Sequence, residues 1–436
     1  MVFSHLALLA SAAPFALAAT SGSFNALSFN VAGLPQFLQG NDESGDKTSN
    51  TAEVGKRFAQ YGYDIIHVQE DFNYHATLYE YDNHTYRTPT SGGVPFGSGL
   101  NTLSNFDWID FTRTKWDKCS DASEFNCFTP KGFTFMRLKI DDGVYIDCYN
   151  LHTDAGTEEG NQVARRANVQ QVADYIDTYS VGNAVLVFGD TNSRYTRTED
   201  NINLFHTQNN LTDAWLSLER NNEIPTVEEV CGNPAENSTC EVVDKMFYRG
   251  SPVLTLNAKS FAYDSQQFLS ANGTTLSDHN PMLVEFEWSS SETLRQSNFI
   301  GGPHGAWFSD SANLTAKASP KGAKLILQGQ NRLDAVAITL GDGTALAHGG
   351  TGGDASDLQL AADEYVNMVY ACQDKYNDHT RVFYLEARTN KEGRVTAGVA
   401  TNDCATFNAP EGWGLVGFVG QDGDEIDQLA VLWAPA

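Results

Sequence analysis

The sequence predicts an α/β domain followed by a smaller, all-β domain. Residues 144–190 contain a strand-like stretch, an amphipathic helix over 163–179 and a second strand-like stretch, which is the order of a strand–helix–strand unit. Residues 289–298 are polar, with one apolar residue, and are typical of a linker. Beyond residue 299, glycine-rich turns and short strand patterns favour an all-β domain.

Composition and charge narrow the class of protein. The chain has 436 residues, 41% of them hydrophobic and 11% aromatic, which is enough for a sizeable core and more than the usual length of one domain. Its formal net charge is −27, which argues against a broad surface for polyanions. A small cationic or metal-binding cleft is compatible with that charge.

Residues 1–19 are predicted to be a secretory signal. The apolar, alanine-rich core over 6–17 is too short to span a bilayer, and residues 16–18 (Ala-Leu-Ala) offer a cleavage site. No later stretch reaches the apolar length of a transmembrane helix. The sequence also holds Asn-x-Ser/Thr sequons at Asn83, Asn210, Asn237, Asn272 and Asn313. We therefore expect a secreted, extracellular glycoprotein without a transmembrane segment.

The seven cysteines fit an oxidising compartment. Short spacings make local pairs plausible for Cys119 with Cys127, Cys231 with Cys240, and Cys372 with Cys404. Cys148 would remain as a buried free thiol in a strand-like stretch. Sequence alone leaves the pairing open, and no cysteine–histidine spacing resembles a zinc site.

The stretch 185–192 combines a buried strand with polar residues at its end. Four apolar residues run into Gly189, and Asp190 and Asn192 follow. Such a run is typical of a strand covered on both faces, and ligands of α/β folds bind at the carboxyl ends of these strands. Taken alone, this stretch favours a loop in which Asp190 and Asn192 form turn hydrogen bonds.

Acids, amides and imidazoles recur where other predicted strands stop. The set comprises Asn30, Glu70, His152 with Asp154, Asp190 with Asn192, Asp244, and Asp278 with His279. Each residue alone has a structural explanation, such as a solvated strand end. If the strands lie side by side, however, the set surrounds one cleft. Carboxylates suit Mg²⁺, imidazoles suit phosphate oxygens, and an Asp–His pair suits proton transfer. The set predicts metal-assisted hydrolysis of a phosphoester.

Residues 24–288 resemble the endonuclease/exonuclease/phosphatase superfamily, which includes deoxyribonuclease I and the sphingomyelinases. The signatures, in family order, are Ser28-Phe-Asn30-Val, Asp64-Ile-Ile-His-Val-Gln-Glu70, Asn150-Leu-His152, Gly189-Asp190-Thr-Asn192 and Ser277-Asp278-His279-Asn-Pro281. The resemblance implies an α/β fold of two sheets packed as a sandwich, as in deoxyribonuclease I, with helices outside.

The resemblance also implies a metal site and a phosphate site. Glu70, with Asn30 nearby, and Asp278 would hold Mg²⁺ or Mn²⁺. His152 and Asn192 would bind the scissile phosphate.

Proton transfer would fall to three further residues. Asp190 would orient or activate the attacking water, and His279 would act as the acid–base, paired with Asp244. Lys245 would either contact phosphate or lie in solvent.

Residues 299–436 resemble a jacalin-type lectin domain, through a glycine-rich opening over 300–310 and closing strands over 417–433. The resemblance implies a three-fold β-prism and a sugar site formed by Gly302, Gly423 and Asp427. A β-module without sugar affinity is the alternative. The expected division is residues 1–19 (signal), 20–288 (catalytic domain), 289–298 (linker) and 299–436 (lectin-like domain).

Together these features favour a secreted phosphodiesterase that acts on a phospholipid headgroup and is targeted to glycans by its C-terminal domain. Residues 118–135 and 30–35 resemble sphingomyelinases more than nucleases, and the charge of −27 would repel a long polyanion. Against a lipid substrate, residues 250–276 offer no apolar hairpin tip of the kind sphingomyelinases insert into membranes. The alternatives are a secreted nuclease that resembles deoxyribonuclease I, acting on nucleic acid, and a carbohydrate-binding lectin with an inactive phosphodiesterase scaffold.

Overall fold

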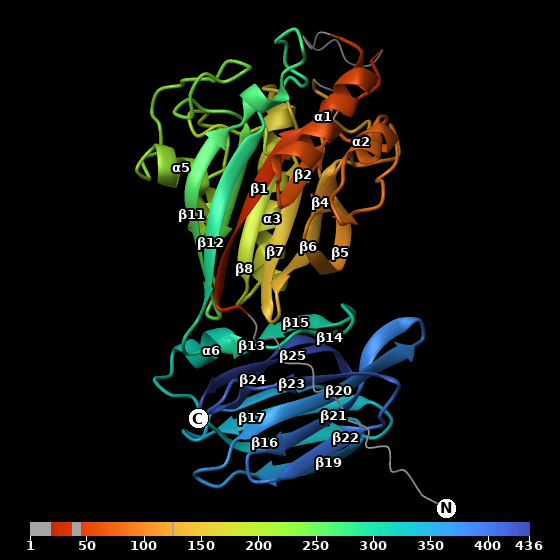
Figure 1. The fold of residues 1–436 in the computed structure, drawn as a ribbon, viewed down its shortest axis with the longest axis vertical. Coiled ribbons are helices and arrows are strands. Elements are labelled where there is room, and N and C mark those ends of the chain that lie inside the picture. The colour runs from red at the N-terminus through yellow and green to blue at the C-terminus, as the bar shows by residue number, and fades with distance from the viewer. Residues whose placement is uncertain (1–18, 37–44, 124–125) are drawn as a thin grey trace, which may run out of the picture.

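The computed structural model describes residues 19–36, 45–123 and 126–436 and shows two domains joined end to end (Figure 1). Apart from Ala19, the predicted signal lies outside the described residues. Two mixed sheets with helices outside form the N-terminal domain, as predicted. Strands dominate the C-terminal domain. Within the described residues, no helix has both the length and the apolar character needed to cross a membrane.

The first sheet of the N-terminal domain has the strand order β11-β12-β1-β2-β4-β3. Its strands are β1 (Ser21–Asn30), β2 (Ile65–Gln69), β3 (Tyr86–Arg87), β4 (Asn101–Ser104), β11 (Leu254–Tyr263) and β12 (Met282–Ser290). β1 and β2 run parallel, with Asn30 beside Gln69, so Asn30 and the residue after β2, Glu70, emerge at the same edge.

The second sheet has the strand order β5-β6-β7-β8-β10-β9. Its strands are β5 (Asp107–Lys115), β6 (Gly132–Asp141), β7 (Val144–His152), β8 (Ala184–Asp190), β9 (Thr212–Asp213) and β10 (Asp244–Arg249). The predicted strand–helix–strand unit is confirmed, because β7 and β8 are parallel and α3 (Glu159–Tyr179) connects them.

Helices cover the outer faces of the two sheets. α1 (Lys47–Tyr61), α2 (His75–Tyr81) and η1 (Ser265–Phe268) lie over the first sheet, and α3 and α4 (Leu204–Thr207) over the second, while α5 (Ala214–Glu219) packs near β10. Asp46 caps the start of α1 by accepting a hydrogen bond from the Ser49 backbone N–H, and Gly62 ends it with φ of 69°. Side chains such as Ile65 and Phe188 fill the space between the sheets.

Three antiparallel sheets enclose a single apolar core in the C-terminal domain. Its elements are β13 (Arg295–Gln296), β14 (Ile300–Gly301), β15 (Ala306–Ser309), α6 (Ser311–Thr315), β16 (Gly322–Gly329), β17 (Leu333–Leu340), β18 (Ala345–Gly349), β19 (Asp354–Gln359), β20 (Val366–Tyr376), β21 (His379–Thr389), β22 (Arg394–Gly398), β23 (Asp403–Asn408), β24 (Trp413–Asp422) and β25 (Ile426–Pro435). β13, within the expected linker, pairs with β25, so part of that polar stretch belongs to the C-terminal sheet.

The three local cysteine pairs are confirmed as disulfides: Cys119–Cys127, Cys231–Cys240 and Cys372–Cys404. Cys148 is the free, buried thiol that the sequence predicts.

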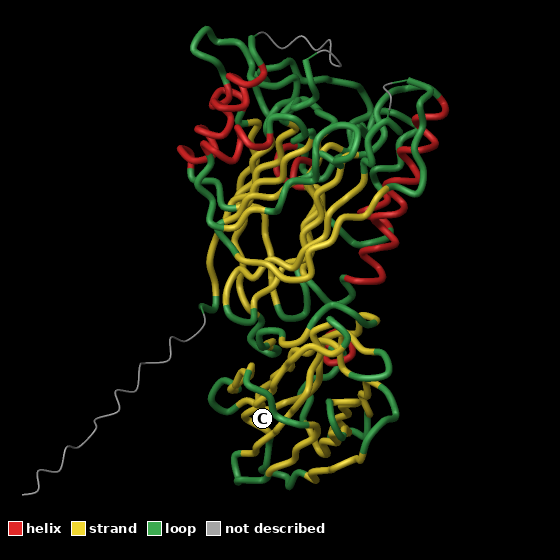
Figure 2. Tube along the Cα trace, turned by 90° about the vertical axis from the view of Figure 1, so that its right-hand side faces the viewer, coloured by secondary structure: helices red, strands yellow, loops and turns green. Residues whose placement is uncertain are grey.

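A buried polar network joins the two domains. Arg137 donates from Nε to Asp110 over 2.9 Å, and Asp110 also accepts from Gln428 Nε2 of the C-terminal domain, at 2.9 Å. The Arg137 guanidinium lies 3.7 Å from the ring centroid of Trp307, whose Nε1 donates to the Val181 carbonyl. Figure 2 shows the sandwich strands running toward this junction, with the long loops gathered at the opposite end.

Replacing Trp307 tests the coupling of the domains. Trp307→Ala removes the contact with Arg137 and the bond to Val181, so we expect a loss of about 1–2 kcal/mol and a fall of about 2–6 °C in the calorimetric unfolding midpoint. Trp307→Phe, which keeps a ring beneath the guanidinium, should retain part of this coupling. An unchanged midpoint in Trp307→Ala would show that the contact does not couple the domains.

Candidate active site

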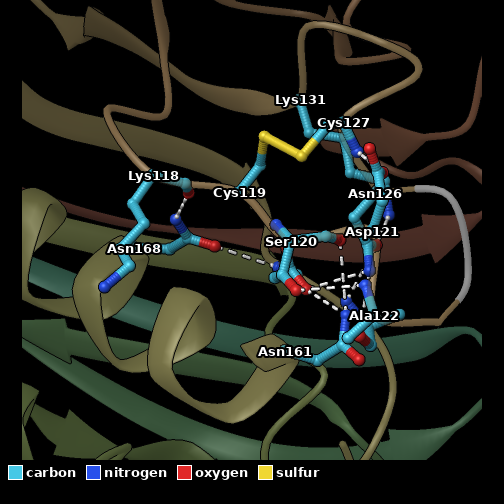
Figure 3. The surroundings of a disulfide bond; sticks show 12 residues. Lys118, Cys119, Ser120, Asp121, Ala122, Asn126, Cys127, Lys131, Asn161 and Asn168 are labelled. Atoms are coloured by element: carbon cyan, nitrogen blue, oxygen red, sulfur yellow. Dashed lines mark hydrogen bonds between the residues drawn. A yellow bond between two sulfur atoms is a disulfide. The ribbon is translucent and has the colours of Figure 1, made fainter. Parts of the chain in front are cut away.

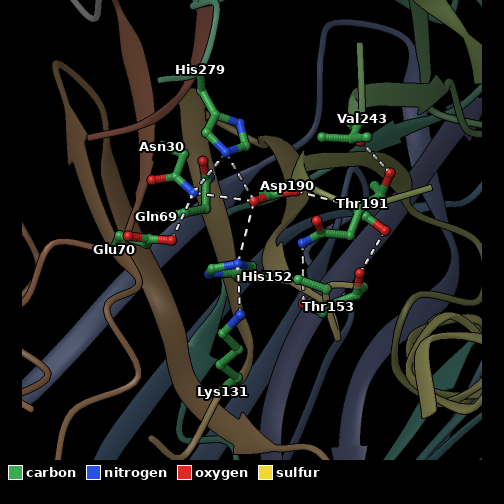
Figure 4. Close-up of polar contacts among 12 residues, drawn as sticks. Asn30, Gln69, Glu70, Lys131, His152, Thr153, Asp190, Thr191, Val243 and His279 are labelled. Atoms are coloured by element: carbon green, nitrogen blue, oxygen red, sulfur yellow. Dashed lines mark hydrogen bonds and ion pairs between the residues drawn. The ribbon is translucent and has the colours of Figure 1, made fainter. Parts of the chain in front are cut away.

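The predicted site residues of the N-terminal domain converge at the end of the sandwich remote from the C-terminal domain (Figures 1 and 4). The pairing register of the strands explains why some of these residues lie together. In the second sheet, His152 pairs with Asp190 across parallel strands, and Asp190 pairs with Asp244 across antiparallel strands. Asn30 reaches the same place from the first sheet, where its Nδ2 lies 3.1 Å from Asp190 Oδ2.

His279 and Asp244 form the expected pair. His279 Nδ1 lies 2.9 Å from Asp244 Oδ2, and His279 Nε2 lies 3.7 Å from Asp190 Oδ2. Burial opposes the charged imidazole, but the Asp244 and Asp190 carboxylates outweigh it and hold the pKa of His279 well above its usual range. The imidazolium therefore donates from Nδ1 to Asp244 and presents a proton on Nε2 toward Asp190.

Asp190 is a buried carboxylate at the centre of this group. Its Oδ2 accepts from Asn30, and its Oδ1 accepts from the Asn192 backbone N–H over 3.0 Å. Burial would raise the pKa of Asp190, but the neighbouring imidazole and ammonium groups reverse the effect and keep the pKa below its usual value. An ionised Asp190 can accept a proton from water.

Lys131 is a site residue that sequence reasoning did not assign. Its Nζ lies 3.0 Å from His152 Nε2 and 3.1 Å from Asn126 Oδ1. Burial and then the Lys131 charge lower the pKa of His152 to about 3, so its imidazole is neutral while Lys131 carries the positive charge. His152 Nε2 also lies 3.3 Å from Asp190 Oδ2. The sequence signal for this residue is the Lys131-Gly132 pair within residues 118–135. That stretch predicts only the substrate class, through its resemblance to sphingomyelinases.

Asp154 supports that loop. Its carboxylate accepts from the Asn126 side chain and the Ser120 backbone N–H, both at 2.9 Å. Figure 3 shows Ser120 and Asn126, the two residues that bond to Asp154, beside the Cys119–Cys127 disulfide. Asp154 therefore fixes the segment that carries Lys131.

Glu70 and Asn30 form the part of the site expected to hold metal. Asn30 Oδ1 accepts from the Ala32 backbone N–H, so its NH₂ faces Glu70 Oε1 at 3.3 Å. Asn30 thus presents a donor that positions carboxylates, which differs from the oxygen ligand expected. Burial raises the pKa of Glu70; the Asp278 carboxylate adds to this and Lys131 opposes it. The Glu70 and Asp278 carboxylates would therefore supply neighbouring oxygen donors of the kind that a hard divalent cation prefers.

Asp190, Asp244 and His279 form another group whose ligand atoms lie within 4.8 Å of one another. Their spacing also suits a cation. However, His279 Nδ1 is bonded to Asp244, and its raised pKa favours the protonated ring, which cannot ligate through that nitrogen. We therefore interpret this group as the His279–Asp244 ion pair beside the Asp190 carboxylate, which accepts hydrogen bonds.

Asn192 and Lys245 occupy different environments. Asn192, with φ of 47°, is half-buried next to Asp190 and donates from Nδ2 to the Thr153 carbonyl over 3.3 Å. Lys245 is buried away from this group, with Nζ 3.3 Å from Glu241 Oε1. The expectation that Lys245 contacts phosphate or lies in solvent is therefore wrong; β10 alternation turns it to the opposite face from Asp244.

In the C-terminal domain, the structure also brings the expected sugar-site residues together. The Gly302 N–H donates to the Asp427 carbonyl over 2.9 Å, and Gly423 lies in the turn before Asp427. The Asp427 carboxylate, however, is buried and bonded to Arg381. Burial raises its pKa to about 6, against the opposing charge of Arg381. A sugar hydroxyl would compete with Arg381 for this carboxylate.

Two solved structures match parts of this chain. Sphingomyelinase C from Streptomyces griseocarneus has a TM-score of 0.43 and 17% identity, covering 61% of this chain and 99% of that chain. A mannose-binding jacalin-related lectin from Ananas comosus has a TM-score of 0.29 and 18% identity, covering 33% of this chain and 99% of that chain.

Sequence comparisons assign both domains. Residues 46–231 match the family model of endonuclease/exonuclease/phosphatase family 2, and residues 297–432 match that of the jacalin-like lectin domain. A curated sphingomyelinase from Mycobacterium bovis is 37% identical over 275 residues, which are 62% of this chain and 53% of that protein. The chain thus spans about half the length of the curated sphingomyelinases it matches. Secreted RxLR effector protein 19 from Plasmopara viticola is 30% identical over 151 residues, covering 33% of this chain and 83% of that protein. The chain therefore carries an endonuclease/exonuclease/phosphatase-family domain that is similar to curated sphingomyelinases, followed by a jacalin-like lectin domain.

Proposed function

We propose that this protein is a secreted, Mg²⁺-dependent phosphodiesterase that hydrolyses a phospholipid headgroup, as a sphingomyelinase or phospholipase C does. The observation that carries the proposal is the convergence of the His279–Asp244 pair, the ionised Asp190 and the Lys131–His152 pair at one end of the sandwich. Similarity to curated sphingomyelinases favours a lipid over a nucleic-acid substrate. Three disulfides and the sequons favour secretion.

The proposed proton transfers are divided between Asp190 and His279. Asp190, fixed by Asn30, accepts a proton from the attacking water. His279 donates its Nε2 proton to the leaving oxygen, and Asp244 keeps the ring oriented. Lys131 places a positive charge beside the phosphate.

Neutral groups complete phosphate binding. His152 and the Asn192 amide orient its oxygens. Glu70 and Asp278 would hold Mg²⁺, which would supply neutralisation of the phosphate charge.

The C-terminal domain would target the enzyme to glycans through Gly302, Gly423 and Asp427. Their proximity and the jacalin-like match support this part of the proposal. The buried Arg381–Asp427 pair is the feature that a bound sugar would have to accommodate.

Metal dependence gives one test. A chelator should abolish hydrolysis, and Mg²⁺ or Mn²⁺ should restore it. Glu70→Gln removes an anionic ligand, so we expect the Mg²⁺ concentration for half-maximal activity to rise about tenfold or more. Glu80→Gln, at an exposed position of α2, is the control and should titrate like the wild type. Full activity in chelator would refute the metal assignment.

The acid–base pair gives a second test, which also identifies the substrate. His279→Ala should lower turnover by roughly 10²–10⁴-fold, and Asp244→Asn should lower it in the same direction without unfolding the protein. Phosphocholine release from sphingomyelin or phosphatidylcholine vesicles, and nicking of duplex and single-stranded DNA, should be measured at equal Mg²⁺.

The exposed His206→Ala is the matched control for this pair and should keep wild-type turnover. Wild-type turnover in His279→Ala or Asp244→Asn would contradict the proposed roles. Nicked DNA without headgroup release would identify a nuclease, and hydrolysis of neither substrate would favour a lectin with an inactive scaffold.

Sugar binding is tested on the full chain with an array of mannose- and galactose-type glycans. Asp427→Asn keeps the size of the side chain but removes its charge, so we expect glycan binding to fall about tenfold or more. Asp357→Asn, on the exposed strand β19 of the same domain, is the control. If the wild-type protein binds no glycan, the domain keeps the lectin shape without sugar affinity.

A further inference from the structure

A chain of hydroxyl hydrogen bonds crosses three strand ends of the candidate active site. Thr153 follows β7, Thr191 follows β8 and Val243 precedes β10. Thr153 Oγ1 donates to the Thr191 carbonyl over 2.5 Å, and Thr191 Oγ1 donates to the Val243 carbonyl, also over 2.5 Å. Figure 4 shows Thr191 between the other two residues, beside Asp190. The three strand ends are therefore joined by side chains as well as by the sheet.

These bonds lie where the backbone ladder of the sheet stops. His152 pairs with Asp190, and Asp190 pairs with Asp244, as the terminal residues of the three strands. Asn192 then has φ of 47°, so the chain leaves the extended conformation that strand pairing needs. The threonine hydroxyls thus add bonds between the strands at the point where the ladder ends.

The bond to Val243 is the principal contact of the Thr191 hydroxyl. Within its own turn, the same oxygen accepts from the Ser193 backbone N–H over 3.3 Å, which is long for a hydrogen bond. The bond to Val243 is much shorter and reaches a residue 52 positions away. Thr191 and Thr153 are fully buried, and a hydrogen bond in such surroundings is stronger than one in water. The hydroxyl therefore fixes one strand end against another.

A second long-range contact joins the same two segments. Glu241 Oε1 accepts from the Tyr195 backbone N–H over 2.8 Å. Glu241 is itself paired with Lys245, at 3.3 Å. The segment that leaves β8 is therefore bound twice to the segment around the start of β10. Of the two contacts, that of Thr191 lies next to the site residues in both segments.

The spacing of β8 and β10 decides how His279 meets Asp190. His279 Nδ1 lies 2.9 Å from Asp244 Oδ2, and its Nε2 lies 3.7 Å from Asp190 Oδ2. The imidazole thus bridges two carboxylates that stand on separate strands. A relative shift of about 1 Å between these strand ends would change both contacts, and misplacement on this scale can slow a reaction about a hundredfold.

We propose that the Thr191 hydroxyl is a positioning group that sets the distance between Asp190 and the His279 imidazole. The proposal rests on the proposed function, in which Asp190 accepts a proton from water and His279 donates one to the leaving oxygen. Both groups act on one phosphate, so their separation must match it. Thr191 acts through the strand ends, because its hydroxyl bonds the Val243 carbonyl.

Kinetics with a soluble diester measure this role. Thr191→Val removes the hydroxyl and keeps the branched shape of the side chain. With bis(p-nitrophenyl) phosphate and Mg²⁺, kcat should fall about tenfold or more. KM should change less than about threefold, because Lys131 and His152 are held by other contacts. Thr191→Ser keeps the donor and should retain a kcat within about threefold of the wild type.

Ser180→Ala is the matched control for a loss of stability alone. It removes another buried hydroxyl, which donates to Asp147 over 2.6 Å toward the start of β7. Its calorimetric unfolding midpoint should fall, as in Thr191→Val, because each variant loses a buried hydrogen bond, but its kcat should stay at the wild-type value. Wild-type kcat in Thr191→Val would overturn the proposal, as would an equal loss of kcat in Ser180→Ala.

Magnetic resonance of isotope-labelled histidine tests the geometry without turnover. The imidazole signal of His279, identified by its absence from His279→Ala, should shift in Thr191→Val and stay near its wild-type position in Thr191→Ser. An unshifted signal in Thr191→Val would overturn the proposal. If the wild type hydrolyses no diester but the signal shifts as expected, the proposed function fails and the positioning role of Thr191 stands.

Discussion

The candidate active site depends on the buried carboxylate of Asp190. Three strands determine its position, because β8 carries it, β7 places His152 beside it and β10 places Asp244 beside it. Asn30 reaches it from the opposite sheet. A buried carboxylate without such donors and cations would be neutral. The packing of the two sheets therefore brings together the groups that keep the Asp190 carboxylate ionised.

Much of the fold follows from local sequence. Buried strands such as β8 are continuous apolar runs, and α3 has the helical period, so both are predictable. β11 is not, because a bulge between Ala258 and Ser260 interrupts its alternation. β5 is not predictable either, since its nine residues lie in a polar region and its register shifts between Ile109 and Thr112.

The candidate site likewise contains residues that the sequence predicts and residues that it does not. Residues at strand ends, such as His152 and Asp190, could be identified because strand order brings them together. Lys131 could not, because its place depends on long-range bonds: Asp154 holds Asn126, and Asn126 holds the ammonium. The orientation of the Asn30 amide depends on a backbone N–H two residues away, which no motif specifies. Strand ends are encoded locally, whereas loop contacts depend on the folded chain.

The junction around Arg137 lies between the candidate active site and the C-terminal domain. Its guanidinium is buried between Asp110 and the Trp307 ring, so the domains meet through a buried contact. The candidate sugar site adjoins this junction through Gln428, while the cleft lies at the other end of the strands. A ten-residue strand such as β1 spans about 33 Å. A glycan bound at the candidate sugar site would therefore lie roughly that far from the candidate active site.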